Sequence, residues 1–136
     1  MSWRNTTPQP IQDDMDDLLD HALNLAEERL AQRGEFYPFG MAIGASGERK
    51  LIGAGTGDAQ QAKAMNFEAL RSMRTDIRAA AVVVDMVLPE TGSNGIEVHI
   101  EHSSGLAIGV LEPYTISRGE VHPEPLEGFT AQRLIW

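Results

Sequence analysis

Cysteine is absent from the 136 residues, and this absence removes several kinds of chemistry at once. The chain has no thiol nucleophile, no thiolate ligand for a metal and no disulfide. A domain of this length can bury roughly two-thirds of the surface that its unfolded chain exposes, so it needs no metal or disulfide to hold a core. The lack of cysteine also fits a reducing compartment.

Long apolar runs are missing as well. The longest one, residues 79–84, is far too short to cross a bilayer. The first residues, Met1 to Pro8, carry a single Arg4 with no apolar run behind it, which is not the pattern of a signal peptide. We therefore expect a soluble, cytoplasmic protein without a membrane partner.

Positive charge is scarce. The 11 lysines and arginines are outnumbered by 20 aspartates and glutamates, which gives a formal net charge of −9. Such a surface repels the phosphates of nucleic acids and anionic lipids, so we expect no nucleic-acid partner. The same charge suits a basic protein partner, although it also serves solubility alone.

Two segments carry the pattern of amphipathic helices. Residues 11–33 repeat apolar side chains at helical spacing, with four aspartates in the first turns and Gly34 as a left-handed cap. Asp58 with Gln61 three residues later is a capping-box pattern, which predicts a second helix over residues 58–74.

Strands are predicted between and after these helices. Their segments are residues 41–45, 51–54, 77–88, 96–102 and 106–111. The tight turn 103–105 pairs Ile100 with Ile108 and His99 with Gly109. Residues 89–95 are turn material, and the prolines between 113 and 125 indicate a loop. Residues 128–136 are a candidate for one more edge strand.

Together these elements predict an α+β fold. We expect an antiparallel sheet of about five strands with two helices, in the order helix-β-β-helix-β-β-β, and both helices on one face. The chain should form a single domain over residues 1–136, with residues 1–9 as a loose N-terminal arm. The predicted core consists of Leu18, Leu25, Phe39, Met65, Val82, Val98, Ile100 and Ile108.

One group of polar residues is a candidate site. Glu97, His99 and Glu101 alternate along a predicted strand and therefore share one face of the sheet. Two carboxylates and a histidine can hold a metal or act as a general base. An alternating strand of this kind is also what a solvated sheet face looks like. We adopt that simpler interpretation, which assigns no catalytic residue, no metal and no other cofactor.

A fourth candidate comes from the neighbouring strand. Pairing Leu88 with Ile96 across the turn 89–95 places Asp85 opposite His99. This pairing would add a carboxylate to the histidine, but cross-strand pairs of this type also stabilise sheets without doing chemistry.

Parts of the chain resemble known proteins. The segment Phe36-Tyr37-Pro38-Phe39-Gly40, the hairpin over residues 96–114 and the closing Leu134-Ile135-Trp136 resemble small uncharacterised bacterial proteins. This resemblance covers most of the chain and implies no activity. The order of the elements is similar to that of roadblock and longin domains, which are dimeric scaffolds with a five-stranded sheet between helices.

Three functions are open at this point. The first is a non-catalytic binding or assembly module that self-associates as a homo-oligomer, since short strands have edges that invite pairing. The second is an acidic immunity or inhibitor protein that neutralises a basic toxin or enzyme. The third is a small enzyme or ligand binder that uses the face of Asp85, Glu97 and His99.

Overall fold

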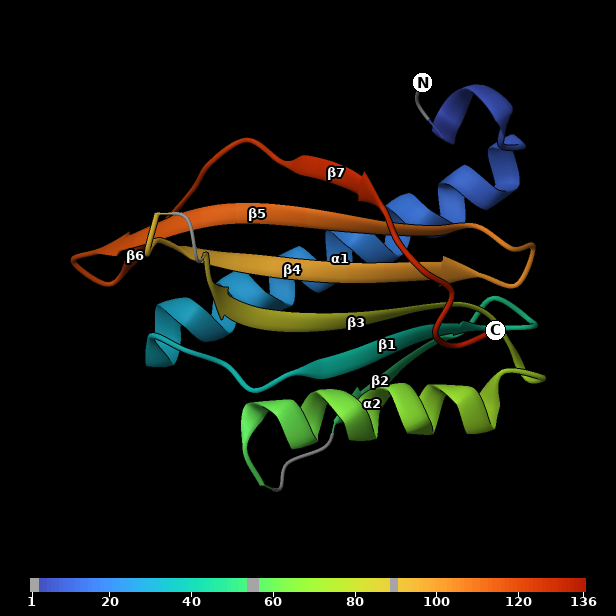
Figure 1. The fold of residues 1–136 in the computed structure, drawn as a ribbon, viewed down its shortest axis with the longest axis horizontal. Coiled ribbons are helices and arrows are strands. Elements are labelled where there is room, and N and C mark those ends of the chain that lie inside the picture. The colour runs from blue at the N-terminus through green and yellow to red at the C-terminus, as the bar shows by residue number, and fades with distance from the viewer. Residues whose placement is uncertain (1–2, 54–56, 89–90) are drawn as a thin grey trace.

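The computed structural model describes residues 3–53, 57–88 and 91–136. It forms one antiparallel sheet in the strand order β2-β1-β3-β4-β5-β6, and β7 also pairs with β5 (Figure 1). The elements are a short 3-10 helix Trp3–Thr6, α1 Gln9–Arg33, β1 Phe39–Gly44, β2 Arg49–Gly53, α2 Ala59–Met73, β3 Ile77–Val87, β4 Asn94–His102, β5 Ala107–Ser117, β6 Glu120–Pro123 and β7 Glu127–Thr130. The predicted α+β fold is confirmed, with seven strands instead of about five.

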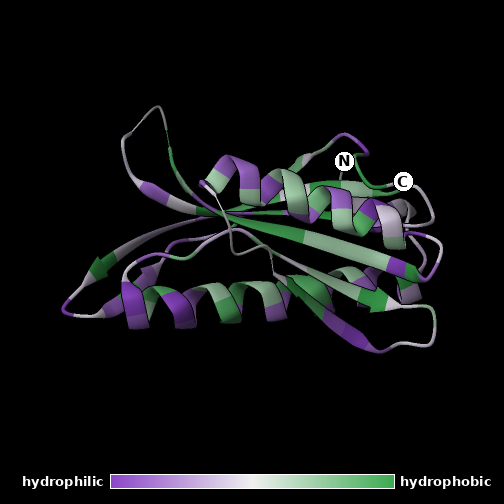
Figure 2. Cartoon of the chain, turned by 90° about the horizontal axis from the view of Figure 1, so that it is seen from below, coloured by the Kyte–Doolittle hydropathy of each residue, from purple (hydrophilic) through white to green (hydrophobic). Residues whose placement is uncertain are grey.

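The two helices cover opposite faces of the sheet (Figure 2). Ala81 and Val83 of β3 pack under α1, whereas Ala80 and Val82 pack under α2. The prediction that both helices lie on one face is therefore wrong. The reason lies in β3, whose continuous apolar sequence is typical of a strand buried on both faces.

The local signals at the helix ends are confirmed. Gly34 adopts a φ of 78° and donates its N–H to the Leu30 carbonyl at 2.7 Å, which ends α1. At the start of α2, the Asp58 carboxylate accepts the Gln61 N–H at 2.8 Å. The Gln61 side chain in turn accepts the Asp58 N–H at 3.2 Å, which completes the capping box.

Three of the four predicted first-turn aspartates, Asp14, Asp16 and Asp17, bind other elements, whereas Asp13 accepts from the Gln9 side chain at the start of α1. Because α1 begins at Gln9, they lie beyond its first turn. Asp16 pairs with Arg4 at 2.6 Å, which attaches the 3-10 helix to α1. Asp17 pairs with Arg49 at 3.0 Å and so joins α1 to β2.

Among the described residues, neither α-helix combines the length and the apolarity that crossing a membrane requires.

The C-terminal third contains more strand than predicted. Strand β5 continues through Pro113 to Ser117, and the proline-rich stretch expected as a loop forms β6. The predicted edge strand over residues 128–136 overlaps β7 only at its beginning. Ala54, at the end of the predicted second strand, and residues 89–90 of the predicted turn lie outside the described residues.

Six of the eight predicted core residues are buried. Leu25 is only partly buried. The prediction that Met65 is buried is wrong, because its side chain is 48% exposed. Helix α2 turns Ala62, Phe67 and Leu70 toward the sheet instead. This orientation buries the ring of Phe67, which removes more apolar surface from water than the Met65 side chain would.

Candidate functional site

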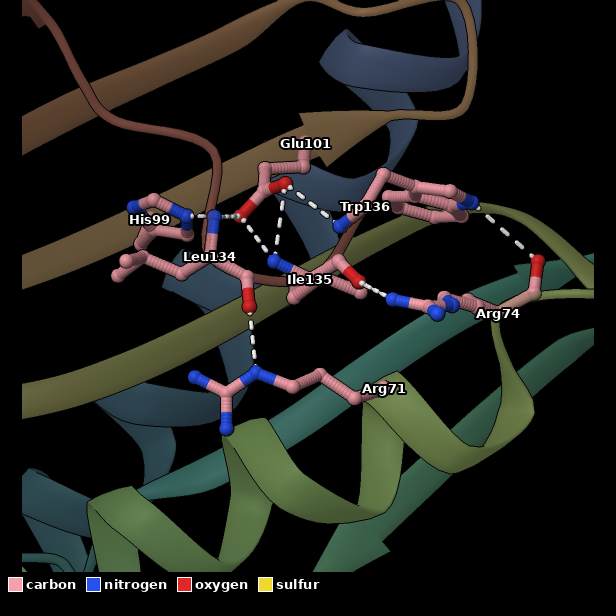
Figure 3. Close-up of polar contacts among 7 residues, drawn as sticks. All are labelled: Arg71, Arg74, His99, Glu101, Leu134, Ile135 and Trp136. Atoms are coloured by element: carbon pink, nitrogen blue, oxygen red, sulfur yellow. Dashed lines mark hydrogen bonds and ion pairs between the residues drawn. The ribbon is translucent and has the colours of Figure 1, made fainter.

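Glu101, predicted to lie on a solvated face, is completely buried. Residues 131–136, here called the C-terminal strap, cross the sheet over this side chain. The carboxylate accepts the backbone N–H groups of Leu134 at 2.7 Å, Ile135 at 3.0 and 3.1 Å and Trp136 at 3.3 Å (Figure 3). Glu101 therefore holds the strap on the sheet.

Helix α2 binds the same strap from the other side. The Arg71 Nε donates to the Leu134 carbonyl at 2.6 Å, and an Arg74 nitrogen donates to the Ile135 carbonyl at 3.5 Å. The indole N–H of Trp136 donates to the Arg74 carbonyl at 3.3 Å (Figure 3). The strap is thus fixed between α2 and β4 by polar contacts on both sides.

The other two residues of the predicted face also have partners. The His99 Nε2 lies 2.6 Å from the Glu101 carboxylate, and its ring meets Phe67 edge-on at 5.2 Å. Glu97 lies 3.9 Å from the Lys63 ammonium. Burial acts to raise the pKa of Glu101, but the hydrogen bonds from His99 and from three backbone N–H groups bring that pKa below its ordinary value.

Asp85 is not part of this group. The observed register pairs Val82 with His99 and Asp85 with Ile96, so the predicted pairing of Leu88 with Ile96 is wrong by three residues. An odd shift moves a side chain to the other face of the sheet. Asp85 therefore lies on the α1 side, where it accepts the Tyr114 hydroxyl at 2.6 Å.

The α1 side holds a buried carboxyl group that sequence reasoning missed. Glu112 is only 5% exposed, and its Oε1 has no hydrogen-bond partner among the described residues. Burial and the neighbouring Glu27 raise the pKa of Glu112 to about 8. Burial also raises the pKa of Asp85, which the Tyr114 hydroxyl partly offsets. Glu112 stands at every second position of β5 with Val110 and Tyr114, so the three side chains point to the same buried face. This spacing could have revealed the burial of Glu112 from the sequence.

A chain of polar contacts at the turn between β4 and β5 has the components of a catalytic triad. The Ser104 hydroxyl lies 3.1 Å from His102 Nδ1, and His102 Nε2 lies 3.1 Å from the Asp14 carboxylate. However, the Ser104 backbone N–H also donates to Nδ1 at 3.1 Å, so this lone pair is already engaged. Arg78 binds both Asp14 oxygens at 3.0 Å. The arrangement therefore fixes the turn against α1 and β3.

The four predicted site residues divide between the two faces of the sheet. Glu97, His99 and Glu101 lie on the α2 side, and Asp85 lies on the α1 side. Within the described ranges, no group of three or more histidine, aspartate or glutamate side chains is arranged to hold a metal ion. Of these residues His99 and Glu101 are in contact, and Glu101 holds the C-terminal strap in place.

Comparisons of the chain with protein-family models, with curated proteins and with solved structures found no match. The resemblance to small bacterial proteins and to roadblock and longin domains stays a prediction. Function is therefore inferred from the geometry of this chain alone.

Proposed function

We propose that this chain is a cytoplasmic, non-catalytic assembly module that self-associates through its edge strand β2. In the described part of the sheet, β2 is outermost on its side and pairs with β1. Its central residue, Leu51, has a side chain that is 57% exposed. An edge strand with an exposed apolar residue is a template for pairing with another strand.

The hydrogen-bond pattern leaves half of the β2 backbone directed away from β1. The Gly44 N–H donates to the Glu48 carbonyl at 2.8 Å, which makes these two residues a hydrogen-bonded pair. Since such pairs alternate along an antiparallel ladder, the next ones toward the end of β2 involve Lys50 and Ile52. The residues whose N–H and C=O groups face outward are Arg49, Leu51 and Gly53.

A second copy related by a twofold axis at Leu51 satisfies these outward groups. Leu51 then pairs with its own counterpart, as an isologous interface requires. Lys50 comes opposite Ile52 of the other copy, so the lysines do not face each other. Arg49 keeps its ion pair with Asp17 of the same chain.

The other edge of the sheet is less suited to pairing. Strands β6 and β7 have four residues each, and Pro123 ends β6. Proline lacks the N–H that a pairing strand would need, so it is a usual protection of sheet edges. The exposed Leu51 and the outward backbone of β2 together carry the proposal.

The test is the mass of the chain in solution, measured by light scattering over a wide range of concentrations. We expect the mass of two chains for the wild type and of one chain for Leu51→Pro. The proline removes only an outward N–H, so it leaves the bonds between β1 and β2 in place. Circular dichroism should confirm that this variant keeps its fold.

A matched pair of substitutions separates the edge from general surface hydrophobicity. Leu51→Lys should abolish the dimer, whereas Val87→Lys, at a residue 62% exposed on another strand, should leave it intact. A monomeric wild type, or a Leu51→Pro dimer of unchanged stability, would contradict the proposal.

A further inference from the structure

The face of the sheet that carries α2 is only partly covered. Helix α2 packs on β1, β2 and β3, and the C-terminal strap crosses β4 at Glu101. Over β5, the Phe129 side chain of β7 lies against Gly109 and is itself 47% exposed, so this part of the face presents an aromatic ring to solvent. Two neighbouring strands and their margins span about 10 Å, which is about the diameter of one α-helix.

A cleft of about 570 Å³ opens on this face, between β5 and the residues on either side of the turn from β3 to β4. Leu88, Leu111 and Pro113 form its apolar floor. A Cβ atom at Gly95 would lie 3.0 Å from a Leu111 methyl carbon and 3.5 Å from a Leu88 methyl carbon. Both leucine side chains therefore lie over the Gly95 backbone, which gives the cleft an apolar base.

The charged side chains that line the cleft are acidic. They are Glu124 and Glu127. Glu124 is fixed beside the floor because its N–H donates to the Pro113 carbonyl at 2.8 Å. Glu127 lies opposite Leu111 in the pairing of β7 with β5. Between them in the sequence, Leu126 is 48% exposed. An apolar floor under carboxylates is complementary to a long cationic side chain.

We propose that this face docks a basic amphipathic helix of a partner protein, with a lysine or arginine side chain in the cleft. The aliphatic stem would lie on Leu88 and Leu111, and the cationic head would meet Glu124 and Glu127. The net charge of −9 would steer such a partner toward the protein. This surface is separate from the β2 edge, so the inference does not rest on self-association.

The probe is a synthetic helical peptide with leucines on one face and lysines on the other. Isothermal titration calorimetry should show that Glu124→Gln with Glu127→Gln weakens its binding about tenfold or more. The matched control, Asp20→Asn with Glu28→Gln, makes the same change of net charge at exposed positions on α1 and should leave the affinity unchanged. The backbone amide signals of Gly95, Gly109 and Leu111 should shift in the NMR spectrum of the complex.

Three results would overturn the proposal. An equal loss of affinity in both double variants would show that the peptide senses only net charge. Equal binding of a peptide with glutamates in place of the lysines would remove the electrostatic basis. A shift of the Gly95 and Gly109 signals with protein concentration alone, in the Leu51→Pro background, would assign this face to a second copy of the chain.

Discussion

Glu101 accepts the backbone N–H of Ile135 with both of its carboxylate oxygens, at 3.1 and 3.0 Å. The two residues are 34 positions apart in the sequence. The contact holds Ile135 against the sheet, where its side chain packs with Phe67 and Val82 in the core under α2. The buried carboxylate of Glu101 therefore has a structural role.

Glu101→Gln should lower the free energy of unfolding by about 2 kcal/mol. The amide keeps one acceptor oxygen but turns an NH₂ donor toward the N–H groups of Leu134 and Ile135. Urea denaturation measures the loss. Glu120→Gln, at an exposed position of β6, is the control and should change stability by less than about 0.5 kcal/mol. Equal effects of the two changes would mean that Glu101 does not hold the strap.

Glu112→Gln should flatten the dependence of stability on pH between the ordinary carboxyl range and about pH 8. The folded-state pKa of Glu112 is about 8, above its ordinary value of 4.5. The bound proton therefore stabilises the fold fully below pH 4.5, and this stability is lost as the pH rises through the folded-state pKa. The loss should be visible as a fall in melting temperature across this range.

The control for this pH effect is Glu28→Gln, at an exposed position on the same helix as Glu27. It should leave the slope of the wild type unchanged. A Glu112→Gln variant with the wild-type slope would show that Glu112 does not hold a proton in the folded state.

Phe67→Ala should destabilise the protein by about 3 kcal/mol, because the ring is 5% exposed and packs between α2 and the sheet. Met65→Ala should cost less than about 1 kcal/mol, since that side chain is 48% exposed. Urea denaturation of both variants compares the two faces of α2. A larger loss at Met65 would mean that the helix presents its other face to the sheet.

Local sequence determined the ends of the helices and one hairpin. Gly34 ends α1 and Asp58 with Gln61 starts α2, because each signal acts within four residues of the chain. The turn 103–105 also set the pairing of His99 with Gly109 as predicted. Short turns leave few registers to choose from, so their pattern is decisive.

A longer turn left the register of the neighbouring hairpin undetermined. The turn between β3 and β4 does not fix which residues pair, and a difference of three positions moved Asp85 away from His99 to the α1 side. The apolar sequence of β3 offered a signal for burial on both faces, but the alternation of β4 suggested a solvated side.

Only the tertiary structure decided what the polar face of β4 does. Glu97, His99 and Glu101 could be placed on one face from their spacing alone. Their surroundings come from α2 and from residues 134–136, which are distant in the sequence and contact β4 only through the tertiary fold. Burial depends on these long-range contacts, so the same alternating pattern that predicts solvent exposure belongs here to a carboxylate enclosed by backbone N–H donors.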